Sequence, residues 1–178
     1  MGRGDEGLTS HQPEIVAVNG RRFAAFAAAV LVFVIDSAGE GAERILLLRS
    51  PRTPRWQIVN GGVEAGETLA AAAVREVAEE AGADLQIRLL GSCHTSSWRY
   101  DDVVTRMIST FWVAEYLGGE AVGGDDMVDS EVAWLTIDEV DALIEDPGLI
   151  PEETWVFRRA LDCYRSWRGD DVELQPDY

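Results

Sequence analysis

The sequence contains no lysine, so its side-chain cations are arginines and two histidines. A chain without lysine cannot form a Schiff base through a lysine amine, and it cannot carry the lysine of a phosphate-binding P-loop. Positive charge is scarce altogether, because 15 arginines stand against 32 acidic residues and leave a formal net charge of −17. We therefore expect no general binding of nucleic acid, which requires a basic surface.

Cysteine and histidine are also scarce. Cys93 and Cys163 lie far apart with no CxxC spacing, which favours two buried, reduced cysteines over a disulfide or a zinc site. His11 and His94 lack the spacing of a metal-binding pair. We expect His11 in a polar tail, and His94 in a loop or a pocket wall rather than in catalysis.

No hydrophobic run is long enough to cross a membrane as a helix. The longest, FAAFAAAVLVFVI at residues 23–35, is shorter than the ~20 residues that a span needs. Its β-branched and aromatic second half predicts a buried strand instead. The N-terminus shows no charged region followed by an apolar core and a cleavage site. We expect a cytoplasmic protein with no membrane partner.

The order of the elements predicts one α/β (α+β) domain in which strands outnumber helices. Residues 1–14 and 169–178 are polar and are predicted to be flexible tails around a domain at 15–168. Residues 15–35 predict two strands joined by a turn at Asn19-Gly20. Further strands are expected at 44–50, 85–100, 103–117 and 131–137, and helices at about 68–81, from 138 and at 154–167.

The segment GGVEAGETLAAAAVREVAEEAGA, residues 61–83, carries the chemistry. At about 100° per residue, its helix places Ala70, Ala73, Val74, Val77 and Ala81 on one face that can pack on a sheet. The neighbouring arc carries Arg75, Glu76, Glu79 and Glu80. Like charges three and four residues apart repel, so this arc needs compensation from outside the helix.

A hard divalent cation would supply that compensation, because Mg²⁺ and Mn²⁺ prefer oxygen ligands and accept substrate phosphates as further ligands. Glu67 can fold back towards Arg75 and form a forked ion pair that fixes the loop against the helix. We expect Gly61, Gly62 and Gly66 to let this loop turn tightly and bring its backbone close to a ligand.

The segment resembles the Nudix box, G-x5-E-x7-R-E-U-x-E-E-x-G-U, where U is bulky and apolar. The matching residues are Gly61, Glu67, Arg75, Glu76, Val77, Glu79, Glu80 and Gly82, and only Ala83 departs from the pattern. The flanks RILLLRS with Trp56, and EVAW at 131–134, are similar to the family more loosely. The resemblance implies the Nudix fold, a mixed β-sheet between helices, and hydrolysis of a nucleoside diphosphate linked to another group.

The resemblance further implies that Glu76, Glu79 and Glu80 hold the metal and that Arg75 with Glu67 orients the loop and helix. Metal held by carboxylates would neutralise charge that develops on the pyrophosphate while water attacks phosphorus in line. The base that activates the water stays open. The candidates are Glu79 and the residues of an acidic loop at 120–131, which are Asp125, Asp126, Asp129 and Glu131.

Arg49, Arg52 and Arg55 precede the box and are candidates for binding substrate phosphates, as are the backbones of Gly61 and Gly62. An equally weighted interpretation makes the arginines a solubilising loop. The tryptophans at 56, 98 and 112 are individually expected in the core rather than stacked on a base.

Asn60 stands where many members of the family carry Pro before the glycine pair. This resembles the subgroup of dihydroneopterin triphosphate and deoxynucleoside triphosphate pyrophosphohydrolases, and predicts a nucleoside or pterin triphosphate as the small-molecule substrate. ADP-ribose, another nucleotide sugar and a dinucleoside polyphosphate are alternatives, as is a module that binds a nucleotide metabolite without cleaving it. The intact Arg75, Glu76, Glu79 and Glu80 favour an enzyme. A homodimer stays open.

Overall fold

The structure is a computed structural model, and it describes residues 13–37, 42–101, 106–124, 127–143, 148–151 and 154–169. Predictions that fall on the other residues, including most of both tails and two base candidates, Asp125 and Asp126, lie outside the described residues. Among the described residues, none of the helices is long and apolar enough to cross a membrane.

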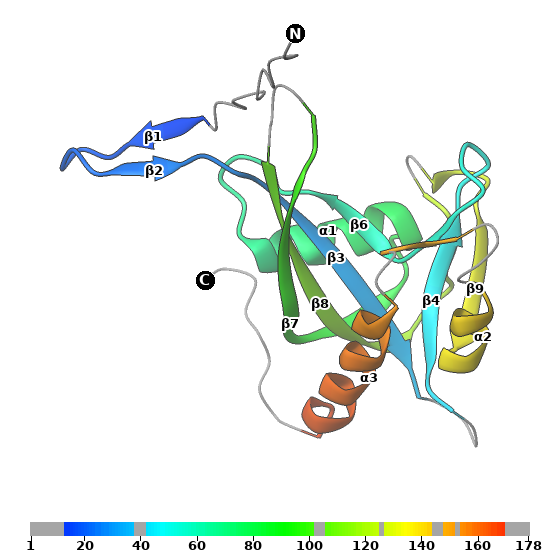
Figure 1. The fold of residues 1–178 in the computed structure, drawn as a ribbon. Helices are drawn as coiled ribbons and strands as arrows, with labels where there is room; N and C mark the ends of the chain where they lie inside the picture. The colour runs from blue at the N-terminus through cyan, green and yellow to red at the C-terminus, as the bar shows by residue number, and fades with distance from the viewer. Residues whose placement is uncertain are drawn as a thin grey trace, which may run out of the picture.

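A large mixed sheet forms the centre of the described residues (Figure 1). Its main path runs β10-β5-β4-β3-β8-β7, with β6 paired to β3 and β9 paired to β4. β3 is parallel to β8 and antiparallel to β4 and β6. The strands are β3 (Ala27–Asp36), β4 (Arg44–Arg49), β5 (Trp56–Gln57), β6 (Val59–Gly62), β7 (Gln86–Arg99), β8 (Arg106–Gly118), β9 (Glu131–Thr136) and β10 (Leu149–Ile150).

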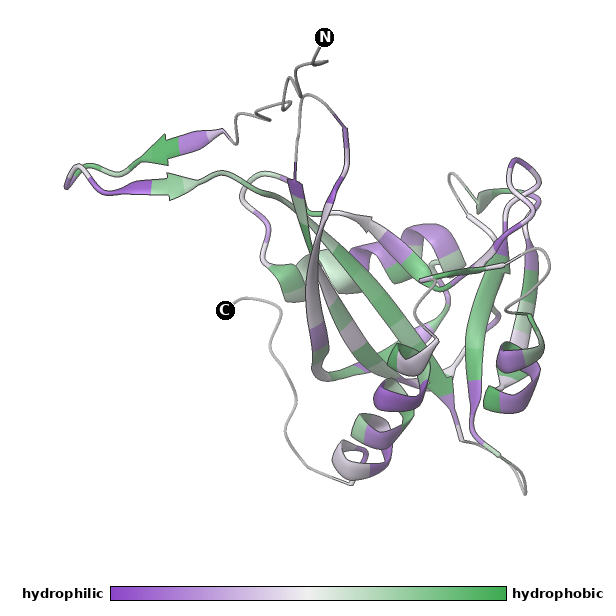
Figure 2. Cartoon of the chain, viewed as in Figure 1, coloured by the Kyte–Doolittle hydropathy of each residue, from purple (hydrophilic) through white to green (hydrophobic). Residues whose placement is uncertain are grey.

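The sheet has a helix on each face, as the sequence predicts. Side chains alternate along β3, so that Val30, Val32 and Val34 pack beneath α1 (Leu69–Ala81). Phe33 and Ile35 point to the opposite face, where they pack with α3 (Trp155–Trp167). Figure 1 shows α1 behind β3 and β6 and α3 in front of the sheet. The central strands are apolar over most of their length, whereas the helices mix polar and apolar residues (Figure 2).

The N-terminal segment forms three strands rather than the predicted two. β1 (Glu14–Val16) pairs antiparallel with β2 (Arg22–Ala24), and β3 begins after a break at Ala25-Phe26. This hairpin projects away from the large sheet (Figure 1). The break was not predicted because residues 23–35 are continuously apolar, and only the pairing of β3 with β6 and β8 shows where the sheet starts.

The box helix α1 has the predicted bounds. The Thr68 side chain accepts a hydrogen bond from the Ala71 amide at 3.1 Å and caps the N-terminus, and Gly82 follows the last turn with φ +110°. The predicted buried face is wrong at Val74, whose exposed fraction is 37%, whereas Ala72 and Glu76 are buried. The helix is thus rotated so that a carboxylate points inward, which a count of apolar residues does not anticipate.

Other sequence predictions concern smaller features. α2 (Ile137–Ala142) begins with a capping box between Thr136 and Glu139. His94 lies on strand β7 rather than in a loop, and its ring contacts the ring of Trp155 at a centroid distance of 4.9 Å. Both cysteines are free, Cys93 is buried and Cys163 is half-buried, and burial raises the pKa of the Cys93 thiol to about 12.

Candidate active site

Arg75 holds the loop that precedes α1. Its Nε donates to Glu67 Oε1 at 2.9 Å and its Nη2 donates to Glu67 Oε2 at 3.0 Å, which is the forked ion pair expected from the sequence. Nη2 also donates to the Gly62 carbonyl at 2.8 Å. Glu67 Oε2 accepts a further hydrogen bond from the Glu64 amide at 3.1 Å. The loop is therefore attached to the helix at both of its ends.

The same guanidinium contacts two of the predicted metal ligands. Nη1 donates to Glu76 Oε1 at 2.8 Å and to Glu79 Oε2 at 2.7 Å. Arg75 lies on the same helix and offsets part of the carboxylate charge, while the compensation expected from outside the helix stays a prediction. Three carboxylates around one arginine raise its pKa above the ordinary range, with Glu67 contributing most. The Arg75 hydrogen bonds lower the pKa of Glu67.

Glu76 is the most buried of the site carboxylates, with a side-chain exposed fraction of 10% against 15% for Glu67 and 40% for Glu79. Burial raises its pKa, and this effect outweighs the opposing effect of Arg75. The burial of Glu76 therefore favours the approach of further positive charge, because a second cation would offset the cost of keeping this carboxylate ionised.

Gly61 makes room for Glu76. A Cβ built on Gly61 would lie 2.0 Å from the Glu76 carboxyl carbon, so this carboxylate occupies the place of a side chain on β6. Gly61 and Gly62 belong to a strand, and of the three loop glycines it is Gly66 that has a positive φ, of +87°. The expectation that all three shape a tight turn is therefore wrong for the first two. Glu80 also contacts β6, because the Asn60 amide donates to its Oε2 at 2.9 Å.

The three carboxylates provide the donor set that a hard divalent cation prefers, namely oxygen atoms on two successive helical turns beside a strand backbone. Glu76 and Glu79 turn towards Arg75, and Glu80 accepts a hydrogen bond from the backbone N–H of Asn60. Among the residues that the structure describes, no three His, Cys, Asp or Glu side chains already converge as a cation site. The chemistry of the donors fits a hard divalent metal.

A cleft of about 690 Å³ begins at β6, on the face of the sheet that α3 covers further along. Its lining comes from β3, β6, β7, β8 and the segment around β10, and comprises Ala29, Val30, Leu31, Arg55, Asn60, Gly61, Gly62, Ser96, Ser97, Trp98, Tyr100, Met107, Ser109, Phe111, Ile150 and Pro151. Asn60 and Gly61 therefore touch the box carboxylates and also line the cleft. β6 thus connects the cleft with the carboxylates of Glu76 and Glu80.

The three candidate arginines do not gather at this cleft. Arg55 lines it. Arg49 instead forms an ion pair with Glu131, its Cα partner in the pairing of β4 with β9, and its guanidinium carbon lies 4.8 Å from the ring centroid of Trp56. Arg52 lines a second hollow of about 370 Å³ together with Asp129 and Glu131. Arg55 therefore lies at the cleft, whereas Arg49 and Arg52 lie beside Asp129 and Glu131 of the acidic loop.

Sequence reasoning missed the far wall of the cleft. Trp98 was expected in the core but is 43% exposed, whereas Trp112 is buried and Trp56 is half-buried. Tyr100 is 56% exposed. The segment SSWRY alternates Trp98 and Tyr100 with Ser97 and Arg99, which is typical of a strand with two different faces, but this pattern does not show that the aromatic face is open.

The comparisons agree with this geometry. The model of the NUDIX domain matches residues 25–159, more than half of the chain, and the chain belongs to this family. A curated relative, the NAD-capped RNA hydrolase NudC of Pseudomonas aeruginosa, is 29% identical over 134 residues, which are 74% of this chain and 43% of NudC. The ADP-ribose pyrophosphatase of Methanocaldococcus jannaschii is 32% identical over 100 residues, 54% of this chain and 58% of that protein.

The chain therefore spans less than two thirds of the length of these curated relatives. Among solved structures, a UDP-X diphosphatase is similar with a TM-score of 0.60 and 13% identity, over 81% of this chain and 65% of that chain. This likeness confirms the fold, a mixed sheet with helices on both faces.

Proposed function

We propose that this chain is a divalent-cation-dependent hydrolase that cleaves the pyrophosphate linkage of a nucleoside diphosphate derivative. The observation that carries the proposal is the contact between the box and the cleft. The same strand, β6, lines the cleft with Asn60 and Gly61 and contacts the carboxylates of Glu76 and Glu80. A pyrophosphate bound there lies next to the predicted metal ligands, as a Nudix hydrolase requires.

Glu76, Glu79 and Glu80 would hold Mg²⁺ or Mn²⁺, which Nudix hydrolases generally use as divalent cofactors. When bound, the cation would neutralise charge on the pyrophosphate oxygens and acidify a coordinated water. Arg75 orients the carboxylates of Glu76 and Glu79 through its Nη1 hydrogen bonds. Through Glu67 and the Gly62 carbonyl it also fixes the strand along which the substrate lies.

Glu79 is our candidate for the general base. Its side chain is 40% exposed, so that a water molecule can approach it, whereas Glu76 is 10% exposed. The candidates from the acidic loop fit less well. Glu131 and Asp129 line the smaller hollow, whereas Glu79 lies on the box helix and shares the Arg75 guanidinium with Glu76.

The geometry supports a nucleoside diphosphate linked to a further group better than a triphosphate. The triphosphate hypothesis combined the Asn60 resemblance with three arginines as phosphate contacts, but Arg55 lines the cleft while Arg49 and Arg52 flank the smaller hollow. A formal charge of −17 disfavours a highly charged ligand where few cations oppose it. The relatives named for NAD-capped RNA, ADP-ribose and UDP-X agree with this class.

A nucleoside or pterin triphosphate is the second candidate, because Arg55 does line the cleft and could contact a third phosphate. A dinucleoside polyphosphate fits the same cleft chemistry. The absence of a nucleic acid partner stays a prediction from net charge, and comparing free NAD with an NAD-capped oligoribonucleotide would test it. The cytoplasmic location and the homodimer also stay predictions.

The deciding experiment measures the release of phosphate products from a panel of nucleotide sugars, dinucleotides and triphosphates, with Mg²⁺ and with excess chelator. We expect turnover that needs the cation and that falls at least ~100-fold in Glu80→Gln, the scale of a lost transition-state electrostatic group. The side-chain carbonyl of Gln can still accept a hydrogen bond from the backbone N–H of Asn60, so the fold should persist. Asp162→Asn, which removes an equal charge from a side chain that is 78% exposed on α3, is the control.

Two outcomes would overturn the proposal. Undiminished turnover in chelator would contradict the role of the cation, and normal hydrolysis by Glu80→Gln would contradict the assigned ligands. Tight binding of a nucleotide without turnover of any compound in the panel would instead support the binding module that the sequence analysis left open.

A further inference from the structure

The far wall of the cleft carries two aromatic side chains at the end of β7. Trp98 is the second-last residue of the strand, opposite Met107 of β8, and Tyr100 directly follows the strand. Both are strongly exposed, 43% for Trp98 and 56% for Tyr100, although their neighbours Ser109 and Phe111 on the same face are buried. Exposed aromatic surface that lines a cleft is typical of a ligand-binding wall.

The indole of Trp98 is held in a fixed orientation. Its Nε1 donates a hydrogen bond to Ser109 Oγ at 2.8 Å, and Ser109 is 2% exposed. The ring of Tyr100 contacts it edge to face, with a centroid distance of 5.5 Å and an interplanar angle of 68°. Because the polar atom of the indole is already used, Trp98 can offer a ligand its apolar ring surface but not its N–H.

The wall lies within reach of the box. One row of paired residues crosses the sheet from Gly62 through Ala29 and Ser109 to Ser96. Three strand-to-strand steps of about 4.8 Å place Ser96 about 14 Å from Gly62, and Trp98 is two residues further along the same strand. An extended nucleotide whose phosphates lie at β6 would therefore place its base at this wall.

We propose that Trp98 and Tyr100 bind the nucleobase of the substrate by stacking, which makes them specificity-determining residues for an aromatic group. The proposal rests on the proposed function for the position of the phosphates, and it adds a binding role for β7. Since the indole N–H is committed to Ser109, Trp98 distinguishes a base from no base but contributes little to the choice among bases.

The test is equilibrium binding of AMP, measured by calorimetry without turnover, to wild-type protein and to the variants Trp98→Ala, Tyr100→Ala and Trp98→Phe. Stacking on one aromatic side chain makes the dissociation constant of AMP rise about 5- to 150-fold on substitution by alanine. We expect this rise in both alanine variants and a much smaller one in Trp98→Phe. Ribose 5-phosphate, which lacks the base, should compete for the site equally well in all four proteins.

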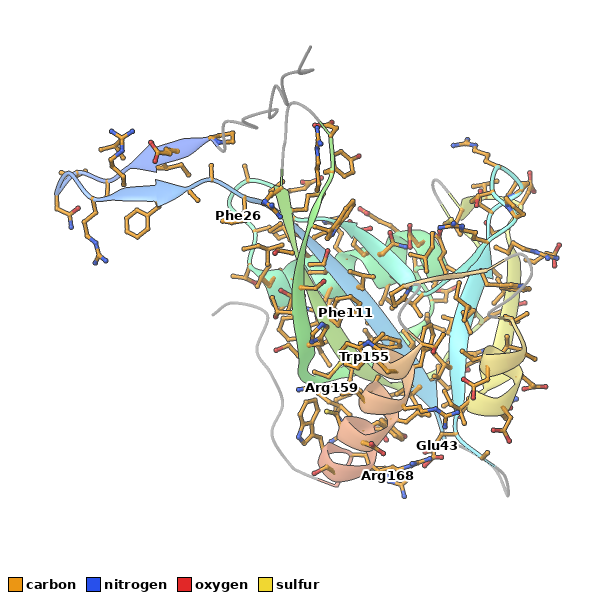
Figure 3. The ribbon with its side chains drawn as sticks, viewed as in Figure 1. Phe26, Glu43, Phe111, Trp155, Arg159 and Arg168 are labelled. Atoms are coloured by element: carbon orange, nitrogen blue, oxygen red, sulfur yellow. The ribbon has the colours of Figure 1, made fainter. Side chains whose placement is uncertain are left out.

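Trp155→Ala is the matched control, because Trp155 is 49% exposed and its ring packs on His94. Figure 3 shows it at the start of α3. This variant should bind AMP like the wild type. Thermal melts would show that each variant is folded. The ratios of the affinities for AMP, GMP, UMP and CMP should change less than threefold in Trp98→Ala, while each affinity falls.

The proposal is overturned if wild-type protein does not bind AMP, if folded Trp98→Ala binds it normally, or if ribose 5-phosphate loses as much affinity as AMP. Failure of the proposed function has a different result. In that case no compound of the hydrolysis panel is cleaved, while AMP binding still depends on Trp98 and Tyr100.

Discussion

The carboxylate of Glu76 lies where a side chain of Gly61 would stand, with its carboxyl carbon 2.0 Å from the position of a Cβ on that glycine. Strand β6 and helix α1 can therefore lie this close together because Gly61 has no side chain. Glu76 is also held by Arg75, so it cannot move away from β6 without breaking a charged hydrogen bond. This contact gives a test in which two adjacent glycines should behave differently.

We expect Gly61→Ala to lower both stability and activity. The added methyl group must displace a carboxylate that is 10% exposed, and overpacking of this kind costs about 1–3 kcal/mol. For a chain of this size that corresponds to a fall in Tm of about 2–12 °C. Gly62→Ala is the control for stability, because nothing lies within 4 Å of a Cβ built there. Equal melting temperatures for the two variants would show that Glu76 does not need the space.

Arg75→Lys tests whether the planar fork matters or only the charge. Lysine cannot contact Glu67, Glu76, Glu79 and the Gly62 carbonyl together, so we expect loss of kcat and a loss of about 1–3 kcal/mol in unfolding free energy. Thermal melts and steady-state kinetics measure both. Full activity with an unchanged melting temperature would make the fork dispensable.

Arg88→Lys is the matched control for that substitution. Arg88 binds Glu115 through Nε at 3.0 Å and the Arg168 carbonyl through Nη2 at 2.7 Å, and its side chain is 27% exposed against 24% for Arg75. It joins β7 to β8 and to the end of α3, away from the box. The variant Arg88→Lys should therefore lower the free energy of unfolding while leaving kcat unchanged. A loss of kcat equal to that of Arg75→Lys would show that the Arg75 effect is only structural.

Local pattern was sufficient to predict the box helix, its bounds and the Arg75–Glu67 pair, because all of these depend on residues within one loop and one helix. The remaining features depend on strand pairing between distant segments. Arg49 binds Glu131, 82 residues away, because the register of β4 with β9 makes them partners. No local pattern contains that register, so the sequence could not show that Arg49 is turned away from the cleft.

The same limit explains why Trp98 was expected in the core and why the burial of Glu76 was not predicted. Whether an aromatic residue on a strand is buried depends on what covers that face, and Trp98 lies where β7 and β8 extend beyond α3 (Figure 1). Glu76 is buried because an arginine and a glycine from a neighbouring strand accommodate it. Residue type alone predicts a solvated carboxylate in such a case.

The ion pair between Glu43 and Arg165 predicts a pH dependence of stability. Arg165 donates to both Glu43 oxygens, at 3.1 and 3.0 Å, and attaches the start of β4 to α3; Figure 3 shows Glu43 beside this helix. These bonds lower the pKa of Glu43 from 4.5 to about 2. A lowered pKa means that the stabilisation is fully present above about pH 4.5 and is lost as the pH falls towards 2.

Glu43→Gln should therefore melt below the wild type at pH 7, and the two curves should converge as the pH approaches 2. Because the Arg165 side chain is 49% exposed, solvent and salt screen the pair, and we expect a difference of at most ~1 kcal/mol at neutral pH. Melting curves across the pH range, repeated in 1 M salt, measure it. A difference that persists unchanged at pH 2 would assign the effect to packing instead of charge.

The last prediction concerns the three arginines and, through them, the substrate class. If the cleft holds a nucleoside diphosphate linked to another group, Arg55 is the arginine that can contact it, because Arg55 lines the cleft. Loss of a charge-assisted hydrogen bond then lowers kcat/KM for ADP-ribose about 10- to 150-fold in Arg55→Ala. Arg52→Ala, which alters the smaller hollow, should stay within about threefold of the wild type.

The same two variants are then measured with a deoxynucleoside triphosphate at equal Mg²⁺, together with Arg49→Ala. We expect the wild type to prefer ADP-ribose in kcat/KM, because a third phosphate meets one arginine rather than three in a chain of net charge −17. A preference for the triphosphate, with similar losses in Arg49→Ala, Arg52→Ala and Arg55→Ala and release of pyrophosphate, would instead support a triphosphate bound by all three arginines. Since that result requires Arg49 to leave Glu131 on binding, it would also show that this ion pair opens.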